Sequence, residues 1–60
     1  MVEIRKLETG NKMLEIRGPM FGAYYIGYWK DGKIVFSKPY LTLHKANIWF
    51  DKYAKKHGMA

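Results

Sequence analysis

Cysteine is absent from this sequence, and acidic residues and prolines are scarce. Without cysteine the chain has neither disulfide bonds nor zinc sites built on thiolates. No apolar run approaches the roughly 18 residues that a membrane-spanning helix needs. Residues 1–5 do not begin the apolar core of a signal peptide. We therefore expect a cytoplasmic protein that makes no membrane contact.

Groups that support catalysis are also few. His44 and His57 are too far apart to share a metal ion on a helix, and no acidic residue completes a ligand set. Asp31 and Asp51 fall in a turn and a helix, so they do not form a catalytic carboxylate pair. Ser37 has no histidine placed by the sequence to activate it. We expect no enzyme activity, no cofactor and no metal.

Positive charge is the first functional signal. Eleven Lys and Arg oppose five Asp and Glu, which gives a net charge of +6 and an isoelectric point of about 9.7. Charges cancel in residues 1–15, whereas residues 16–60 hold eight cationic and two anionic side chains. An isoelectric point above about 9 in a small domain is typical of proteins that bind nucleic acid. Lysine-rich surfaces also serve solubility alone.

The 60 residues suffice for one domain, and 48% apolar residues supply a dense core. Alternating apolar and polar residues predict an antiparallel sheet. Strands are expected at about 2–7, 12–17, 23–30 and 33–37. Pro19 is expected to end the second strand and Pro39 the last, because proline cannot donate a hydrogen bond to a neighbouring strand.

A helix is predicted over about residues 42–57. Thr42 is a suitable N-cap, and Gly58 is the residue expected just after the end of the helix. The sequence thus predicts one α+β domain over residues 1–60, with a three- or four-stranded antiparallel sheet packed against one C-terminal helix.

Asp31-Gly32 predicts a two-residue hairpin turn, because both positions of a type I′ turn need positive φ. The expected pairs are Lys30 with Lys33, Trp29 with Ile34, Tyr28 with Val35, and Gly27 with Phe36. One sheet face then carries Tyr24, Ile26, Tyr28 and Val35, and the other carries Tyr25, Gly27, Trp29, Ile34 and Phe36. Both faces are apolar and one helix covers only one of them, so the other face is expected to be either exposed or covered by a partner. The pattern leaves open which of the two faces is the core.

The segment from Tyr24 to Lys33, with its tyrosines and its Asp-Gly turn, resembles a known DNA-binding hairpin. Together with Thr42, Ala46 and Trp49 it resembles the AP2-like fold, which includes the plant AP2/ERF domain and the N-terminal arm-binding domain of phage-type tyrosine recombinases. In that family the sheet face opposite the helix enters the major groove of DNA. The resemblance implies that Arg17, Phe21, Trp29 and Phe36 face DNA, and that Tyr24, Ile26, Tyr28 and Val35 lie in the core.

The function expected from charge and resemblance together is nucleic-acid binding by a basic, aromatic sheet face, with DNA favoured and RNA an alternative. The candidate site residues are Arg17, Phe21, Tyr25, Trp29, Lys30, Lys33, Phe36 and Lys38. The aromatic members are suited to stacking on bases, and the lysines to neutralising phosphates. Two alternatives remain: a protein-interaction module, and a homodimer formed through the apolar sheet face.

Overall fold

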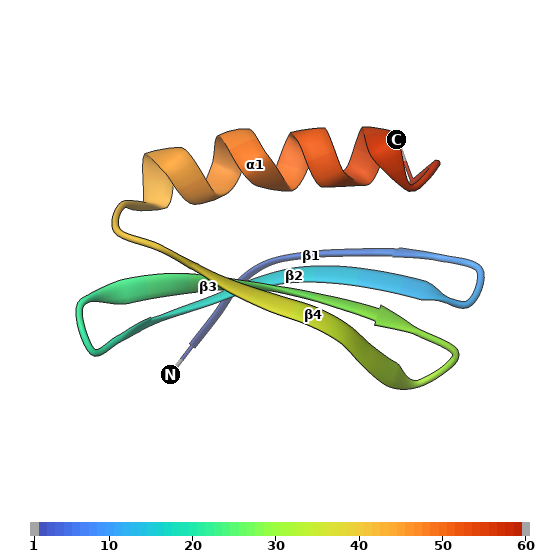
Figure 1. Cartoon of the computed structure of the whole chain (residues 1–60), viewed down its shortest axis with the longest axis horizontal. Coiled ribbons are helices and arrows are strands. Elements are labelled where there is room, and N and C mark those ends of the chain that lie inside the picture. The colour runs from blue at the N-terminus through green and yellow to red at the C-terminus, as the bar shows by residue number, and fades with distance from the viewer. Residues whose placement is uncertain (1, 60) are drawn as a thin grey trace.

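Four strands form one sheet, and a helix crosses one of its faces (Figure 1). The structure is a computed structural model that describes residues 2–59. Its elements are β1 (Val2–Thr9), β2 (Lys12–Met20), β3 (Ala23–Lys30), β4 (Lys33–Tyr40) and α1 (Leu43–Lys56). Strands adjacent in sequence pair antiparallel in the order β1-β2-β3-β4. The predicted α+β class is confirmed.

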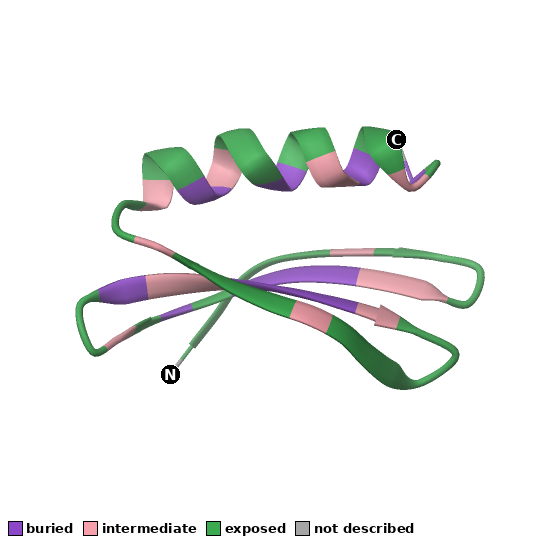
Figure 2. Cartoon of the chain, in the orientation of Figure 1, coloured by how far each residue is buried: buried purple, intermediate pink, exposed green. Residues whose placement is uncertain are grey.

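The core lies between α1 and the two central strands, where Figure 2 shows the buried residues. Alternation along β2 and β3 turns every second side chain toward the helix, and the helical repeat returns apolar residues to the facing side. The buried cluster consists of Leu14, Ile16, Ile26, Tyr28, Ala46, Phe50, Ala54 and Met59. The edge strands β1 and β4 stay largely exposed.

Both helix ends follow the local sequence. The hydroxyl of Thr42 accepts a hydrogen bond from the Lys45 backbone N–H at 3.1 Å, as an N-cap does. Gly58 adopts φ 70°, and the N–H of Met59 donates to the carbonyl of Ala54 at 2.7 Å. This C-terminal motif satisfies carbonyls that the helix leaves free, and it places Met59 in the core.

The β3–β4 turn was predicted correctly at its tip. Asp31 and Gly32 adopt φ values of 53° and 76°. Lys30 pairs with Lys33 and Trp29 with Ile34, as expected.

Beyond that tip the predicted register is wrong, because a β-bulge at Val35 shifts the pairing by one residue. Tyr28 pairs with Phe36, and Gly27 with Ser37. A one-residue shift moves side chains to the opposite face of a sheet. Phe36 therefore faces α1, with its ring 5.0 Å from that of Tyr53. Val35, expected in the core, is 56% exposed.

The two prolines do not end their strands where expected. β2 continues to Met20, and its pairing with β3 is irregular between Arg17 and Met20, where Pro19 lies. β4 continues through Pro39 to Tyr40. Since β4 is an edge strand and Pro19 lies at an irregularity, neither proline interrupts regular pairing on two sides.

One side chain ties the edge strand β1 to the helix. The guanidinium of Arg5 donates to Asp51 at 2.7 Å and to Asn47 at 3.2 Å, and it lies 4.1 Å from the centre of the Phe50 ring. Arg5 thus covers an apolar core residue while its charge stays paired at the surface.

Phe50→Ala should destabilise the domain by about 3–5 kcal/mol, because the ring is 1% exposed and its loss leaves a cavity. The same substitution at Phe21, which is 93% exposed, is the control and should change stability by no more than about 0.5 kcal/mol. Urea unfolding followed by circular dichroism measures both values. Equal effects of the two substitutions would contradict this core.

Candidate nucleic-acid interface

The sheet has a face that α1 does not cover, which we call the open face. Alternation and register place five charged side chains there, three acidic and two basic: Glu3, Lys6, Glu8, Glu15 and Arg17. Its other members from β2, β3 and β4 are mainly apolar or small: Met13, Tyr25, Gly27, Trp29, Ile34, Ser37 and Pro39. The open face is therefore aromatic but not basic.

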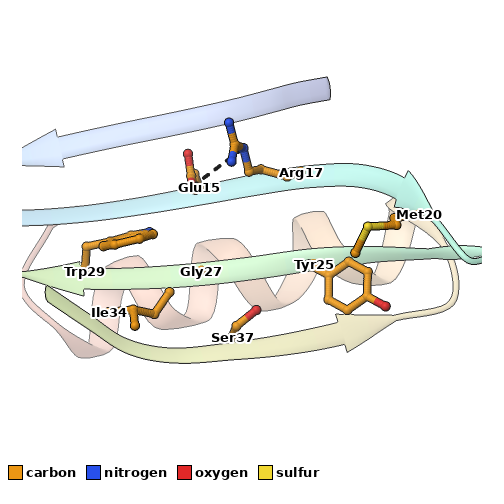
Figure 3. A pocket seen from close by; sticks show the side chains of 8 residues that line it. All are labelled: Glu15, Arg17, Met20, Tyr25, Gly27, Trp29, Ile34 and Ser37. Carbon is orange, nitrogen blue, oxygen red and sulfur yellow. Dashed lines mark ion pairs between the residues drawn. The ribbon is translucent and has the colours of Figure 1, made fainter. Parts of the chain in front are cut away.

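A cleft of about 280 Å³ lies on the open face around Gly27 (Figure 3). Glu15 and Ser37 are the neighbours of Gly27 on the adjacent strands, and Trp29 and Tyr25 flank it along β3. Trp29, Ile34 and Glu15 each place a side-chain atom 3.3–3.8 Å from where a Cβ on Gly27 would lie, so their side chains border the cleft at this point.

The indole of Trp29 extends from its own position toward Gly27. A Cβ atom placed on Gly27 would lie 3.3 Å from the indole Nε1. This N–H is buried and has no hydrogen-bond partner among the described residues. A buried donor without a partner costs about 1–3 kcal/mol of stability. The Trp29 N–H is such a donor in the single chain.

Glu15 is the buried acid of the cleft. Its side chain is 8% exposed, and its carboxylate lies 3.8 Å from Nε of Arg17, which is 48% exposed. On the neighbouring strand, the ammonium of Lys6 lies 3.3 Å from the carboxylate of Glu8. The hydrogen bond and the charge of Glu8 raise the pKa of Lys6. These two contacts leave the charges of the open face close to balance.

A group of basic residues lies on the other side of the sheet, near the β1–β2 and β3–β4 turns. Figure 1 shows these turns at the same end of the molecule as the C-terminus of α1. Lys12 pairs with Lys30 in the sheet, and Lys30 pairs with Lys33. Paired residues share a face, so three lysines form one row across β2, β3 and β4, which we call the lysine row. Asn11 and Asp31 join the two turns by a 2.6 Å hydrogen bond.

His57 lies beside the lysine row. The ammonium of Lys12 donates a hydrogen bond to the backbone carbonyl of His57 at 2.8 Å. The imidazole of His57 stacks on the Tyr28 ring, with ring centres 4.3 Å apart. Burial, followed by the charges of Lys56, Lys12 and Lys30, lowers the pKa of His57. The same charges would favour an approaching anion.

Aromatic rings and lysines alternate along the β4 side of the helix. Successive rings lie 5.0–6.2 Å apart in the order Phe36, Tyr53, Trp49 and Tyr40. The hydroxyls of Tyr40 and Tyr53 share a 2.8 Å hydrogen bond, and burial, with that bond, raises the pKa of Tyr40. Two ammonium groups lie over these rings, Lys38 at 5.6 Å from Tyr53 and Lys52 at 4.5 Å from Trp49.

The predicted site residues are divided between these surfaces. Arg17, Tyr25 and Trp29 share the open face. Phe21 projects from the β2–β3 turn, and Lys30 and Lys33 belong to the lysine row. Placing Phe36 on the DNA-facing side of the sheet was wrong, because the bulge turns it toward α1. Lys38, the remaining candidate, pairs with the core residue Ile26 and so also lies on the helix side.

Sequence reasoning missed Lys12, Glu15 and His57 as members of these surfaces. Lys12 joins the lysine row only through the register of β2 with β3, which no local pattern gives. Glu15 occupies a place in an alternating strand that is usually solvent-exposed. Its burial follows from its position opposite Gly27 and beside Arg17.

Within residues 2–59, no three histidine or acidic side chains come together as metal ligands, and α1 is too short and too polar to cross a membrane. No family model, curated protein or solved structure matches this chain. Its likeness to the AP2-like fold therefore stays a resemblance of sequence pattern.

The lowered pKa of His57 predicts that stability falls as the pH drops below about 6.5. Unfolded histidine takes up a proton near that pH, before the folded imidazole does, so the unfolded state binds more protons and is favoured. The contribution is complete above about pH 7. Thermal unfolding between about pH 7.5 and 5 measures it. His57→Gln should weaken the pH dependence over this interval. The control His44→Gln should retain it, and equal curves for all three proteins would contradict the assignment.

Proposed function

We propose that this protein binds nucleic acid, with DNA as the first target, and that the lysine row contacts the phosphates. It is a proposal for a binding protein rather than an enzyme. The observation that carries it is the row itself: Lys12, Lys30 and Lys33 lie side by side on adjacent strands. Directly opposed like charges destabilise a sheet, so the arrangement works against folding.

The surroundings leave this charge available to a ligand. No ion pair among residues 2–59 includes a lysine of the row, and the interaction of Lys12 is with a neutral carbonyl oxygen. Asp31 supplies the nearest acid along the chain, and its carboxylate accepts a bond from Asn11. Lys55 and Lys56 add positive charge in the last turn of α1.

The position of the phosphates differs from the one that the family resemblance implies. The AP2-like arrangement would place DNA on the open face, which here carries three carboxylates and only Lys6 and Arg17 as cations. DNA carries a high density of negative phosphates, so it should bind the cationic surface in preference to the open face. We therefore assign phosphate contacts to the lysine row, and we leave Arg17 out of them.

Lys30→Gln with Lys33→Gln should weaken binding to every DNA sequence alike. Each lost phosphate contact removes about one unit from the dependence of log affinity on log salt, so the slope should fall by about two. Fluorescence anisotropy with labelled duplex, single-stranded DNA and RNA oligonucleotides at several salt concentrations measures this. The matched control, Lys6→Gln with Lys45→Gln, removes two charges outside the row and should leave the slope unchanged.

The same double variant at Lys30 and Lys33 should be as stable as the natural protein or slightly more stable, because it relieves like-charge repulsion. If this variant binds DNA more weakly but is as stable as the natural protein, the two lysines contact the ligand rather than support the fold. A natural protein whose binding is insensitive to salt, or a control pair that loses as much affinity as the row variant, would contradict the proposal. Tighter binding to RNA than to DNA would change the target and keep the site.

A further inference from the structure

The open face exposes apolar surface that α1 leaves uncovered. Ile34 on this face is 51% exposed, and the rings of Tyr25 and Trp29 are only partly buried. Exposed apolar surface on a small domain often marks an interface. The chemistry of the occupant follows from the arrangement of charge and shape on the face.

We propose that two copies of this chain pack face to face through their open faces, related by a two-fold axis. The axis runs across the strands at the level of the paired residues Ile16 and Ile26. Such a dimer presents the same patch from both copies, so every contact occurs twice.

Strand register divides the open face into two rows, one on each side of this axis. The first row runs across the four strands as Glu3, Arg17, Tyr25 and Pro39. The second row runs as Lys6, Glu15, Gly27 and Ser37. A rotation by 180° about the axis lays the first row of one copy over the second row of the other, strand upon strand.

Opposite charges then meet on both strands that carry them. Glu3 lies over Lys6 of the partner subunit, and Arg17 lies over the partner's Glu15. The buried carboxylate of Glu15, which has one guanidinium at 3.8 Å within its own chain, gains a second one from the other copy. A two-fold axis parallel to the strands would instead lay Glu3 over the partner's Pro39 and Arg17 over the partner's Tyr25, so that no opposite charges meet. The charges therefore favour the axis that runs across the strands.

Shape agrees with charge at the same place. The rotation puts the ring of Tyr25 over the partner's Gly27, one of the residues that line the cleft of about 280 Å³. A tyrosine ring suits such a partly apolar cleft, because it combines a large apolar area with a hydroxyl group that can stay at the polar edge. Each cleft is therefore completed by the second copy.

The remaining surface argues for the same occupant. The other side of the molecule carries the lysine row and the lysines of α1, so two copies repel each other through it. Four strands of about eight residues make a face of about 19 Å by 26 Å, or about 500 Å² per copy. A total near 1,000 Å² is at the lower limit of specific interfaces. We expect a reversible dimer with a dissociation constant in the micromolar range.

Sedimentation equilibrium between about 1 µM and 1 mM tests the dimer across that range. Arg17→Glu should raise the dissociation constant at least about tenfold, because two acidic groups then face each other in each cleft. The control Lys45→Glu makes the same charge change on α1, outside the open face, and should leave the constant unchanged.

Exchanging the charges of Glu15 and Arg17 tests the proposed pairing most directly. Glu15→Arg combined with Arg17→Glu should recover most of the association lost in Arg17→Glu alone, because the two-fold arrangement again opposes unlike charges. Tyr25→Ala should also weaken association while it leaves every charge in place. Circular dichroism establishes that each variant is folded before sedimentation.

A natural protein that stays monomeric to about 1 mM overturns the proposal. If Arg17→Glu and the control Lys45→Glu raise the dissociation constant equally, this interface is wrong. It is also wrong if the double variant Glu15→Arg with Arg17→Glu dimerises no more tightly than Arg17→Glu alone. The result is independent of nucleic-acid binding, since folded Arg17→Glu keeps the lysine row and should bind oligonucleotides as a monomer. Loss of DNA binding in Lys30→Gln with Lys33→Gln should likewise leave the dimer intact.

Discussion

A single helix of 14 residues has to provide the cover for a four-stranded sheet, and the rest of the structure depends on that constraint. Alternation along a strand gives the sheet two faces, and one helix covers only one of them. Leu14, Ile16 and Ile26 are buried beneath α1, whereas Tyr25 and Trp29, their neighbours on β3, have no element above them. The domain therefore folds with its second apolar surface open.

The distribution of charge follows the same division. Carboxylates and cations nearly balance on the open face, where Glu15 and Arg17 lie close together. The excess of lysine lies on the helix side and at the turns. An apolar face without excess positive charge can approach another copy, while the opposite side attracts anions. The two interaction surfaces proposed above lie on opposite sides of the sheet, so binding at one need not block binding at the other.

Arg5 and His57 are polar side chains that cover aromatic residues at the edges of the core. Arg5 pairs with Asp51 and covers the Phe50 ring, so it connects an edge strand to the helix without burying an unpaired charge. His57 stacks on Tyr28 and closes the end of the core beside the lysine row. Burial of the imidazole in the core and the charges of its lysine neighbours both lower the pKa of His57.

Local sequence determined the elements of this fold. Asp31-Gly32 sets a turn that needs positive φ twice, Thr42 caps the helix and Gly58 ends it, and each of these effects acts within a few residues. Only the tertiary structure decided which side chains share a surface. The bulge at Val35 moves Phe36 and Lys38 to the helix side, because a shift of one residue reverses a strand's faces. Lys12 joins Lys30 and Lys33, and Glu15 lies opposite Gly27, through pairing between strands that no local pattern specifies.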